Sequence, residues 1–386
     1  MPSEVVVTAR GARRWESGHP WIYRSDVRRE PEVQEPGVVT VRSARDRYLG
    51  RALYSPASEI RLRLLSRGDE PVDTAWWTAR LREAHARRAA IDATAYRVVH
   101  AEADSLPSLI VDRYGPHAVV QLLSAGLERC RADVIAAVEE ALEPDGILLR
   151  NDAPVRQHEN LPLEVEVVSG TVPDDVEVEE HSVRYRAALR TGQKTGVFLD
   201  QRENRALAGR LGRGRALDIF SYQGAFALHL AQRADSVVAV DSSADALARG
   251  RENADLNGLA NIEWVEANAF DTLRELERSG ERFDLIVLDP PAFAKTKASL
   301  GRALAGYKEV NLRAMRILAP GGRLFSFSCS FHVGRALFLE MIAAAAADSG
   351  RRLALERTLG QSADHPEIPA IPETGYLKGA LLRFDG

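Results

Sequence analysis

The sequence predicts an α/β protein of two or three domains, and three observations support this class. The chain has 386 residues, which exceeds the usual size of one domain. Apolar residues make up 45% and charged residues 27%, as in a globular protein with a sizeable core. From about Arg186 onward, strand-like runs alternate with helical segments, which predicts a parallel sheet covered on both faces.

Residues 1–68 are expected to form a first module of short strands. GVVTVRS and EIRLRLLS alternate with the two-residue period of half-buried strands. This stretch holds 13 arginines against 8 acidic residues, a net charge of +5, whereas the whole chain carries −4. Two interpretations follow: a solvated charged surface, or a local contact with nucleic acid. RGDEP is expected to link this module to the next.

Residues 69–185 are expected to form a smaller α/β unit. One helix is predicted at DTAWWTARLREAHARRAAID and another at about residues 127–142. Cys130 lies on the apolar stripe of the second helix, so it is predicted to be a small core residue with no reactive role. The other members of that stripe are Leu127, Val134, Val138 and Ala141.

Residues 186–386 contain seven candidate strands. They are RALDIF, SVVAVD, NIEWVEA, FDLIVLD, RLFSFSC, RLALERTL and LKGALLRF. Helical segments lie between the first five, and another precedes the sixth. The last two have no helix between them, so one of the two is free to run antiparallel to the rest.

Several classes of protein are disfavoured by what the chain lacks. Two cysteines cannot build a disulfide framework, and no Cys/His spacing resembles a zinc site. MPSEVVVTAR lacks the order of a signal peptide, and no apolar run is long enough to span a membrane. We therefore expect a cytoplasmic protein with no metal and no membrane contact.

A cofactor site is predicted where the first strand ends in LDIFSYQGAF. Asp218 lies at the carboxyl end of that strand, and Gly224 allows a tight turn into a helix. Asp241 ends the second strand, about 20 residues after the loop, where it can accept both hydroxyls of a ribose. The loop lacks G-x-G-x-x-G, so a pyrophosphate is not supported, and a dehydrogenase is the least favoured class. S-adenosylmethionine fits better, with loop contacts from Phe220, Ser221 and Tyr222.

A substrate site is predicted where the fourth strand ends in VLDPPAF. Asp289 follows a buried run, so its carboxylate lies at the same edge of the sheet and also borders the cofactor. Two prolines stiffen the loop, and an aromatic ring offers a stacking face. This combination suits a base flipped out of a nucleic-acid stack. The predicted substrate-binding residues are Pro290, Pro291, Phe293 and Lys295.

The fifth strand, RLFSFSC, ends at Cys329, and consecutive central strands would bring this thiol near Asp289. A thiolate can attack carbon 6 of a pyrimidine, which makes carbon 5 nucleophilic enough to take a methyl group from the cofactor's sulfonium. Removal of the carbon-5 proton then lets the thiolate leave. Ser328 and Ser330 are expected to leave room for the base. Arg202 or Lys295 is expected to favour the thiolate. Cys329 and Asp289 are thus the predicted catalytic residues.

At this point the sequence resembles the bacterial 23S ribosomal RNA cytosine-C5 methyltransferases with an N-terminal PUA domain. The strings that carry the resemblance are HPWIYRSDV, YSPASEIRLRLL, EADSLPSLIVDRYG, EEHSVRYR, GQKTGVFLDQRENR, LDIFSYQGAFALH, DPPAFAK, GYKEVNLRAM, FSCS, DHPEIP and YLKG. The resemblance implies a PUA RNA-binding β-barrel at residues 1–68 and a central α/β domain at 69–185. It implies a Rossmann-like class I methyltransferase domain at 186–386 that uses S-adenosylmethionine.

The resemblance also implies contacts that the pattern alone does not give. GQKTGVFLDQRENR would run beside the cofactor, with Gln201 and Arg202 near the methionine end or the substrate. Without it, GQKTG would be predicted to be a hairpin turn with Lys194 in solvent. The implied partner is 23S ribosomal RNA or the assembling large ribosomal subunit, and the implied assembly is a homodimer.

The sequence departs from the related enzymes at two places. The family usually has an acid after the third strand to receive the adenine amino group, and EANAF places Asn268 there. Its amide oxygen can still accept a hydrogen bond, but without charge. Other RNA cytosine-C5 methyltransferases carry a second cysteine in the fourth-strand motif, where this chain has Pro290 and Pro291. The group that removes the carbon-5 proton is therefore unassigned.

The predicted function is S-adenosylmethionine-dependent formation of 5-methylcytosine in 23S ribosomal RNA. One alternative is nitrogen methylation of a purine such as guanine by the same domain, for which an Asp-Pro-Pro-aromatic motif is also suited. Another is a non-catalytic ribosome-assembly factor that binds RNA through residues 1–68. Cys329 separates the first two, because only carbon-5 chemistry needs a nucleophile.

Overall fold

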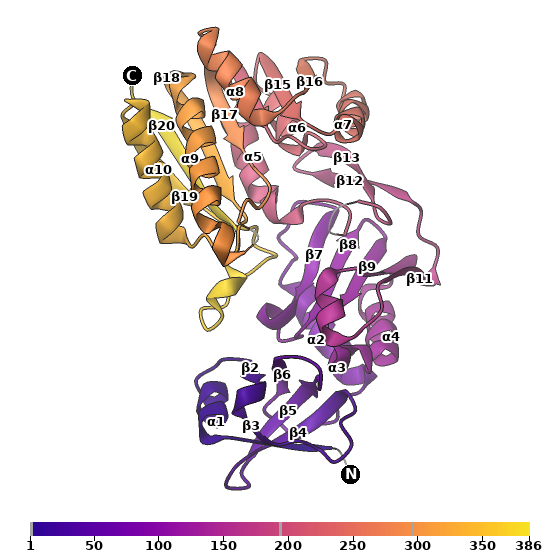
Figure 1. Cartoon of the computed structure of the whole chain (residues 1–386). Helices are drawn as coiled ribbons and strands as arrows, with labels where there is room; N and C mark the ends of the chain where they lie inside the picture. The colour runs from indigo at the N-terminus through magenta and orange to yellow at the C-terminus, as the bar shows by residue number, and fades with distance from the viewer. Residues whose placement is uncertain (1–2, 193–194, 295) are drawn as a thin grey trace. The chain divides into compact units, whose positions relative to one another are not determined.

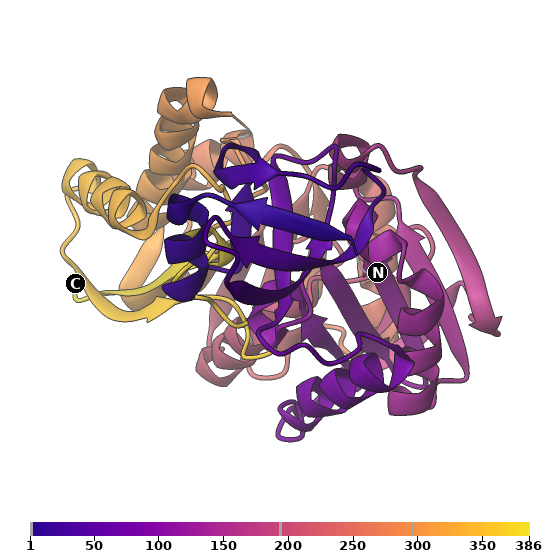
Figure 2. The ribbon, with the colours of Figure 1, turned by 90° about the horizontal axis from the view of Figure 1, so that it is seen from below.

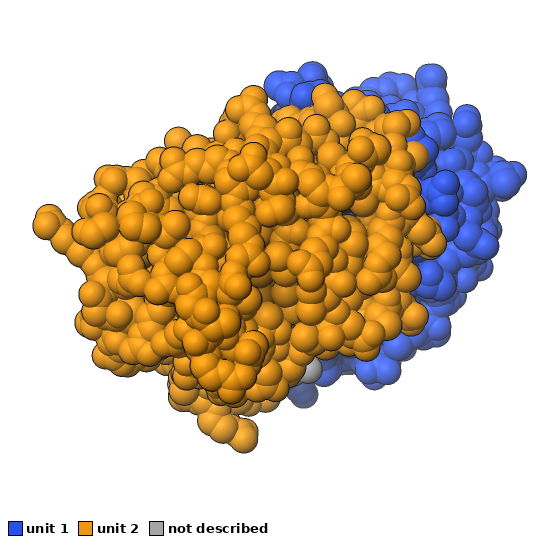
Figure 3. Space-filling model, turned by 90° about the horizontal axis from the view of Figure 1, so that it is seen from above, with its two compact units in different colours: residues 1–178, 186–199, 364–372 blue, residues 179–185, 200–363, 373–386 orange. Residues whose placement is uncertain are grey.

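The computed structural model describes residues 3–192, 195–294 and 296–386. The chain divides into two compact units, shown in blue and orange in Figure 3. Unit 1 comprises residues 1–178, 186–199 and 364–372, and unit 2 comprises residues 179–185, 200–363 and 373–386. Both units combine sheets with helices (Figure 1), which confirms the α/β class.

The first sheet of unit 1 has six strands in the order β2-β6-β5-β4-β1-β3, drawn in indigo to violet in Figures 1 and 2. Helix α1, Ala9–Glu16, begins at Thr8, whose side chain accepts a hydrogen bond from the Gly11 amide. Trp15 of this helix is buried against the sheet. The strands are β1 Glu4–Val7, β2 Trp21–Tyr23, β3 Val27–Arg29, β4 Gly37–Ser43, β5 Tyr48–Tyr54 and β6 Ile60–Ser66.

Strand β6 departs from the half-buried alternation that the sequence predicts. Arg61 and Arg63 are both buried although they alternate with leucines. Arg61 forms an ion pair with Glu30 at 2.7 Å, and Arg63 with Glu159 at 2.9 Å. Buried guanidinium groups need such partners, and these two arginines present no charge to solvent.

The second sheet of unit 1 has five strands in the order β11-β10-β9-β8-β7. All neighbours are antiparallel except β9 and β10. The strands are β7 Ala95–His100, β8 Leu109–Tyr114, β9 His117–Leu122, β10 Gly146–Asn151 and β11 Glu164–Gly170. Helix α2, Thr74–Ala86, contributes Trp77 and Leu81 to the core of this sheet. A separate hairpin follows, formed by β12, Asp175–Glu180, and β13, Val183–Ala188.

The single helix predicted at residues 127–142 is wrong in one respect. The chain forms α3, Ala125–Glu128, and then α4, Arg131–Leu142, with Cys130 at the N-cap of the second helix. Cys130 is buried in the apolar core, which confirms its structural role. Burial raises the pKa of its thiol to about 11, so this cysteine is kept in the unreactive form.

Unit 2 contains one sheet of seven strands in the order β16-β15-β14-β17-β18-β20-β19. β20 runs antiparallel to both of its neighbours, as the missing helix allows, while β14 to β18 are parallel. The strands are β14 Arg215–Ile219, β15 Ser236–Asp241, β16 Ile262–Glu266, β17 Phe283–Leu288, β18 Leu318–Ser328, β19 Leu353–Leu359 and β20 Lys378–Phe384.

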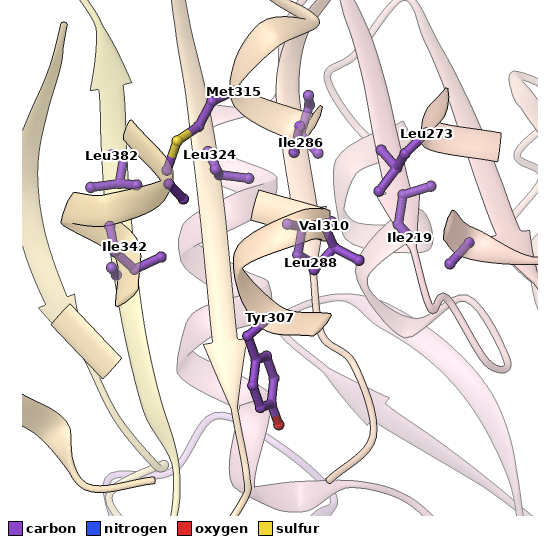
Figure 4. Packing of buried hydrophobic residues seen from close by; sticks show 14 of the residues in the cluster. Ile219, Leu273, Ile286, Leu288, Tyr307, Val310, Met315, Leu324, Ile342 and Leu382 are labelled. Carbon is purple, nitrogen blue, oxygen red and sulfur yellow. The ribbon is translucent and has the colours of Figure 1, made fainter. Parts of the chain in front are cut away.

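Helices cover both faces of this sheet, as predicted. One core cluster joins the sheet to α8, α9 and α10, and a second joins its other face to α5 and α6. Figure 4 shows the first cluster, in which Tyr307 lies at one end with its hydroxyl beyond the aliphatic side chains. The helices are α5 Arg202–Leu211, α6 Ala225–Ala231, α7 Ala244–Leu256, α8 Ala269–Arg278, α9 Leu300–Arg316 and α10 Arg335–Ser349.

Among the described residues, no helix combines the length and the apolar composition that crossing a bilayer requires.

Candidate active site

The loop after β14 has an unusual backbone. Phe220, Tyr222 and Gly224 all have positive φ, at 69°, 51° and 75°. Bulky residues rarely adopt this conformation, and such strain concentrates at functional sites. A Cβ atom on Gly224 would lie 2.3 Å from the Trp264 ring, so glycine is required there both by φ and by space. The loop then enters α6 directly, with Gly224 at its N-cap, as the sequence predicts.

Two buried oxygens at this loop lack hydrogen-bond partners. Asp218 is 1% exposed, and its Oδ2 accepts a hydrogen bond from the Ala227 amide at 2.9 Å. Its Oδ1 and the hydroxyl of Ser221 have none within the described residues. Burial, reinforced by the charge of Asp289, raises the pKa of Asp218 to about 8. Buried polar atoms normally have partners, so this pair fits a bound polar or cationic ligand.

Asp241 lies half-buried at the end of β15, beside the same loop. Its Oδ2 accepts from the Tyr222 amide at 2.8 Å, and its Oδ1 accepts from the Ser243 amide at 3.0 Å. Each carboxylate oxygen has a second lone pair, so both remain able to accept from a ribose hydroxyl. The loop after β14 thus orients the carboxylate that is predicted to bind the ribose.

Asn268 caps a helix in the structure. It is the N-cap of α8, where its Oδ1 accepts from the amides of Phe270 at 2.9 Å and Asp271 at 3.3 Å. Its oxygen is therefore engaged by the helix, and only the Nδ2 group is left, which can donate but not accept. The contact of the Asn268 oxygen with an adenine amino group stays a prediction, in which the adenine competes with the helix amides.

Asp289 is held by a relay of two amides. Gln201 donates from Nε2 to Asp289 Oδ1 at 2.9 Å, and Asn204 donates from Nδ2 to Gln201 Oε1 at 2.6 Å. Gln201 and Asn204 are both buried. The family resemblance places Gln201 at the site, but no sequence signal pointed to Asn204. Arg202 is also buried, and it donates to Glu203 at 2.9 Å.

Phe293, the predicted stacking residue, packs against other aromatic rings of the protein. Phe293 is half-buried, and its ring centroid lies 4.6 Å from that of Tyr307 and 6.0 Å from that of Phe270. Pro290 is buried and Pro291 is exposed, while Lys295 lies outside the described residues, as does Lys194. Phe331, which was not predicted to belong to the site, is 60% exposed just after Cys329 and offers a freer ring.

The structure brings Cys329 to the Asp289 loop. The residue follows β18 directly and is half-buried, and its Sγ donates to the Pro290 carbonyl oxygen at 3.9 Å. The parallel pairing of β17 with β18, in which Leu288 faces Ser326, produces this proximity.

The two serines that flank Cys329 are held by hydrogen bonds, and their expected role of leaving room for a base stays a prediction. Both are wholly buried. Ser330 Oγ accepts from the Ala294 amide at 3.1 Å and pairs with the Tyr307 hydroxyl at 2.8 Å, while Ser328 Oγ accepts from the Ser330 amide at 3.3 Å. These bonds fix the loop on either side of Cys329, which is half-buried.

Comparison with known proteins identifies two segments of the chain. Residues 150–383 match the S-adenosylmethionine-dependent methyltransferase model, and residues 5–67 match a PUA-like domain. The first match covers more than half of the chain. The protein therefore belongs to the S-adenosylmethionine-dependent methyltransferases, and S-adenosylmethionine is its cofactor.

Curated relatives make the family more specific. A Tolumonas auensis protein named "Ribosomal RNA large subunit methyltransferase I" is 40% identical over 379 residues, which span 95% of each chain. A Salmonella arizonae protein of the same name is 39% identical over 378 residues, or 95% of this chain and 93% of its own.

Solved structures share the fold across nearly the whole chain. A Streptococcus mutans chain classed among SAM-dependent methyltransferases has a TM-score of 0.82 at 20% identity, covering 98% of this chain and 99% of its own. A second, classed as a methyltransferase and complexed with SAH, has a TM-score of 0.84 at 20% identity with the same coverage. At these identities the likeness concerns the fold alone.

Proposed function

We propose that this protein methylates carbon 5 of a cytosine in 23S ribosomal RNA through a transient covalent bond from Cys329. The observation that carries the proposal is the position of half-buried Cys329, whose Sγ lies 3.9 Å from the Pro290 carbonyl oxygen of the Asp-Pro-Pro loop at the carboxyl edge of the sheet. The curated relatives named "Ribosomal RNA large subunit methyltransferase I" support the RNA substrate. Nitrogen methylation would leave this cysteine without a task.

The residues at the β14 edge fit S-adenosylmethionine, which supplies an activated methyl group and a positive charge when bound. Asp241 would hold the ribose through its free lone pairs. Asp218 and Ser221 present unpartnered buried oxygens at the same loop, where the polar methionine end would complete their hydrogen bonds.

Asp289 would orient the base, and Cys329 would act as the nucleophile. Asp289, oriented by Gln201, would accept hydrogen bonds from the Watson–Crick edge of cytosine and place the ring over the thiol. The Cys329 thiolate would form a bond to carbon 6, and the electron pair of the 5,6 double bond would become available at carbon 5. After methylation, loss of the carbon-5 proton restores the double bond and releases the thiolate.

Residues 1–68 would supply RNA affinity, residues 69–185 would form the central domain, and residues 186–386 would carry catalysis. The match of residues 5–67 to a PUA-like domain supports the first assignment. Arg13, Arg28 and Arg45 are exposed and form no ion pair within the described residues, so they are available for phosphate. The proposal includes 23S RNA or the assembling large subunit as partner, and a cytoplasmic homodimer.

A covalent trap tests the proposal. RNA that carries 5-fluorocytosine should become linked to the wild-type protein, because fluorine cannot leave carbon 5 as a proton does. The adduct should survive denaturation, and Cys329→Ala should form none and lose methyl transfer while still binding S-adenosylmethionine. Cys130→Ala is the matched control and should still form the adduct. Full methylation by Cys329→Ala would move the assignment to nitrogen methylation at Asp289.

A further inference from the structure

A buried lysine, Lys378, contacts the loop that contains Cys329. Lys378 is the first residue of β20, and its Cα pairs across the strands with that of Ser328 in β18. Its Nζ donates to the carbonyl oxygen of Ser330 at 2.7 Å and to that of Tyr376 at 2.7 Å. Lys378 therefore contacts the residue after Cys329 and pairs with the residue before it.

The surroundings of Lys378 contain no acid that neutralises it. The residue is 3% exposed, and within the described chain no carboxylate forms an ion pair with it. An unpaired buried ammonium group is costly unless an anion lies nearby. Two carbonyl oxygens accept two of its three N–H groups, so one donor has no acceptor among the described residues.

The ionisable groups that act on Lys378 are Cys329 and Arg335. Burial is the largest influence and lowers the pKa of Lys378 to about 8, while negative charge on Cys329 raises it and Arg335 lowers it. Tyr307 of α9 faces the same loop; burial mainly raises the pKa of its hydroxyl, and charge on Cys329 adds to the effect. Of these groups, Cys329 is the one whose negative charge favours a charged Lys378.

We propose that Lys378 is the counter-ion of the Cys329 thiolate. The ammonium group stabilises the anion that forms when the thiol gives its proton to water, and Lys378 itself keeps its protons throughout. Once sulfur bonds to carbon 6 its charge is consumed, and the same ammonium group stabilises the thiolate when that bond breaks. The inference rests on the proposed function in one respect, the role of Cys329 as nucleophile.

Thiol alkylation tests the pairing without RNA. The full chain with Cys130→Ser is treated with iodoacetamide over a range of pH, and modification of Cys329 is followed by mass spectrometry. An opposite charge close to a thiol shifts its titration by about one unit or more, so Lys378→Met should slow alkylation near neutral pH by at least about tenfold and move the profile to higher pH.

Three further variants make the result specific. Lys378→Gln should behave like Lys378→Met although it can still donate to both carbonyls, and Lys378→Arg should retain much of the reactivity. Lys308→Met is the matched control, because Lys308 lies on α9 and pairs with Asp348 at 2.6 Å; its profile should match the parent. An unchanged profile in a folded Lys378→Gln or Lys378→Met protein would overturn the proposal.

The RNA trap separates this role from that of a base. Lys378→Gln should form the 5-fluorocytosine adduct slowly near neutral pH and recover at higher pH. Adduct formation at the parent rate, with accumulation on ordinary RNA, would overturn the proposal and identify Lys378 as the group that takes the carbon-5 proton. If alkylation depends on Lys378 but the parent never forms an RNA adduct, the pairing stands and the proposed function fails.

Discussion

Unit 2 contains two sets of buried charges that differ in whether their partners are complete. The first surrounds Glu180, whose two oxygens accept from Arg205 at 2.8 and 2.6 Å and from the Tyr185 hydroxyl at 2.6 Å. Burial alone would raise the pKa of Glu180, but the Arg205 ion pair outweighs it and lowers the pKa to about 2. Glu180 therefore has a complete set of partners, although the buried Nε2 of His229, 3.4 Å from Glu180 Oε1, has no hydrogen bond among the described residues.

The second set follows the carboxyl edge of the sheet and is incomplete. Asp218 retains an unpartnered oxygen and a raised pKa, and Lys378 has carbonyls but no carboxylate around it among the described residues. Both sets are buried, so burial alone does not tell them apart. The two sets differ in whether each charged group has a partner within the protein. We infer that fully paired charges stabilise the fold, whereas incompletely paired charges bind a ligand or a reacting group.

Breaking the complete set should have the largest effect on stability. Arg205→Met leaves Glu180 buried without its ion-pair partner, which should cost about 3–5 kcal/mol of unfolding free energy. Urea denaturation near neutral pH measures this. Arg210→Met, on the exposed end of the same helix, is the control and should change stability by less than about 0.5 kcal/mol. A small effect of Arg205→Met would contradict the distinction.

At the incomplete edge, a substitution should affect ligand binding more than folding. Asp241→Ala should weaken S-adenosylmethionine binding by roughly 1.5–3 kcal/mol, the range for hydrogen bonds to a charged group. Calorimetric titration measures this. Asp245→Ala, in the exposed first turn of α7, controls for general removal of negative charge. Unchanged affinity in a folded Asp241→Ala protein would remove Asp241 from the site.

The sequence predicted those parts of the site that follow from strand order. Each of four residues lies at or directly after the carboxyl end of an apolar strand, and parallel strands deliver these ends to one edge. The four are Asp218, Asp241, Asp289 and Cys329. Strand-and-helix alternation was therefore sufficient to group them. The Asn268 cap was also readable, since an Asn before a helical run is a standard N-cap signal, but the family resemblance pointed to the adenine instead.

The remaining features depend on register and distant partners. Lys378 reaches the carbonyl of Ser330, beside Cys329, only because β20 runs antiparallel beside β18, a register that no local pattern specifies. Arg63 looked like a solvent-facing member of an alternating strand, and its partner Glu159 lies 96 residues away. Asn204 belongs to the site only through Gln201, which it orients and which in turn contacts Asp289.

The protonation of Asp218 should make stability depend on pH. Its pKa is about 8 in the folded chain against an ordinary value of 3.8, so the folded state binds a proton that the unfolded state releases between these values. Its contribution to stability is therefore present at low pH and disappears as pH rises toward 8. Asp218→Asn removes this dependence, so the variant should gain at least about 1 kcal/mol over wild type between about pH 5 and pH 8. Parallel pH profiles from urea denaturation would contradict this.

The smallest effect should come from exposed arginines of the first module, where the same comparison applies at the surface. Arg13, Arg28 and Arg45 form no ion pair within the described residues, whereas Arg10, Arg29 and Arg47 face Asp26, Glu4 and Glu16. Changing the first three to serine should weaken RNA binding. It should also reduce the slope of log affinity against log salt by about 0.7–0.9 for each phosphate that the protein no longer neutralises.

Changing the ion-paired arginines, Arg10, Arg29 and Arg47, to serine should reduce the slope of log affinity against log salt by less. The reason is that their carboxylate partners already offset part of their charge. Fluorescence titration of a ribosomal RNA fragment at several salt concentrations measures both slopes. Equal slopes in the two triple variants would show that ion pairing on this module does not decide which arginines meet phosphate. A slope unchanged in both would place the RNA contact outside residues 1–68. S-adenosylmethionine affinity should stay constant in every case, since these arginines belong to unit 1 and the cofactor loop to unit 2.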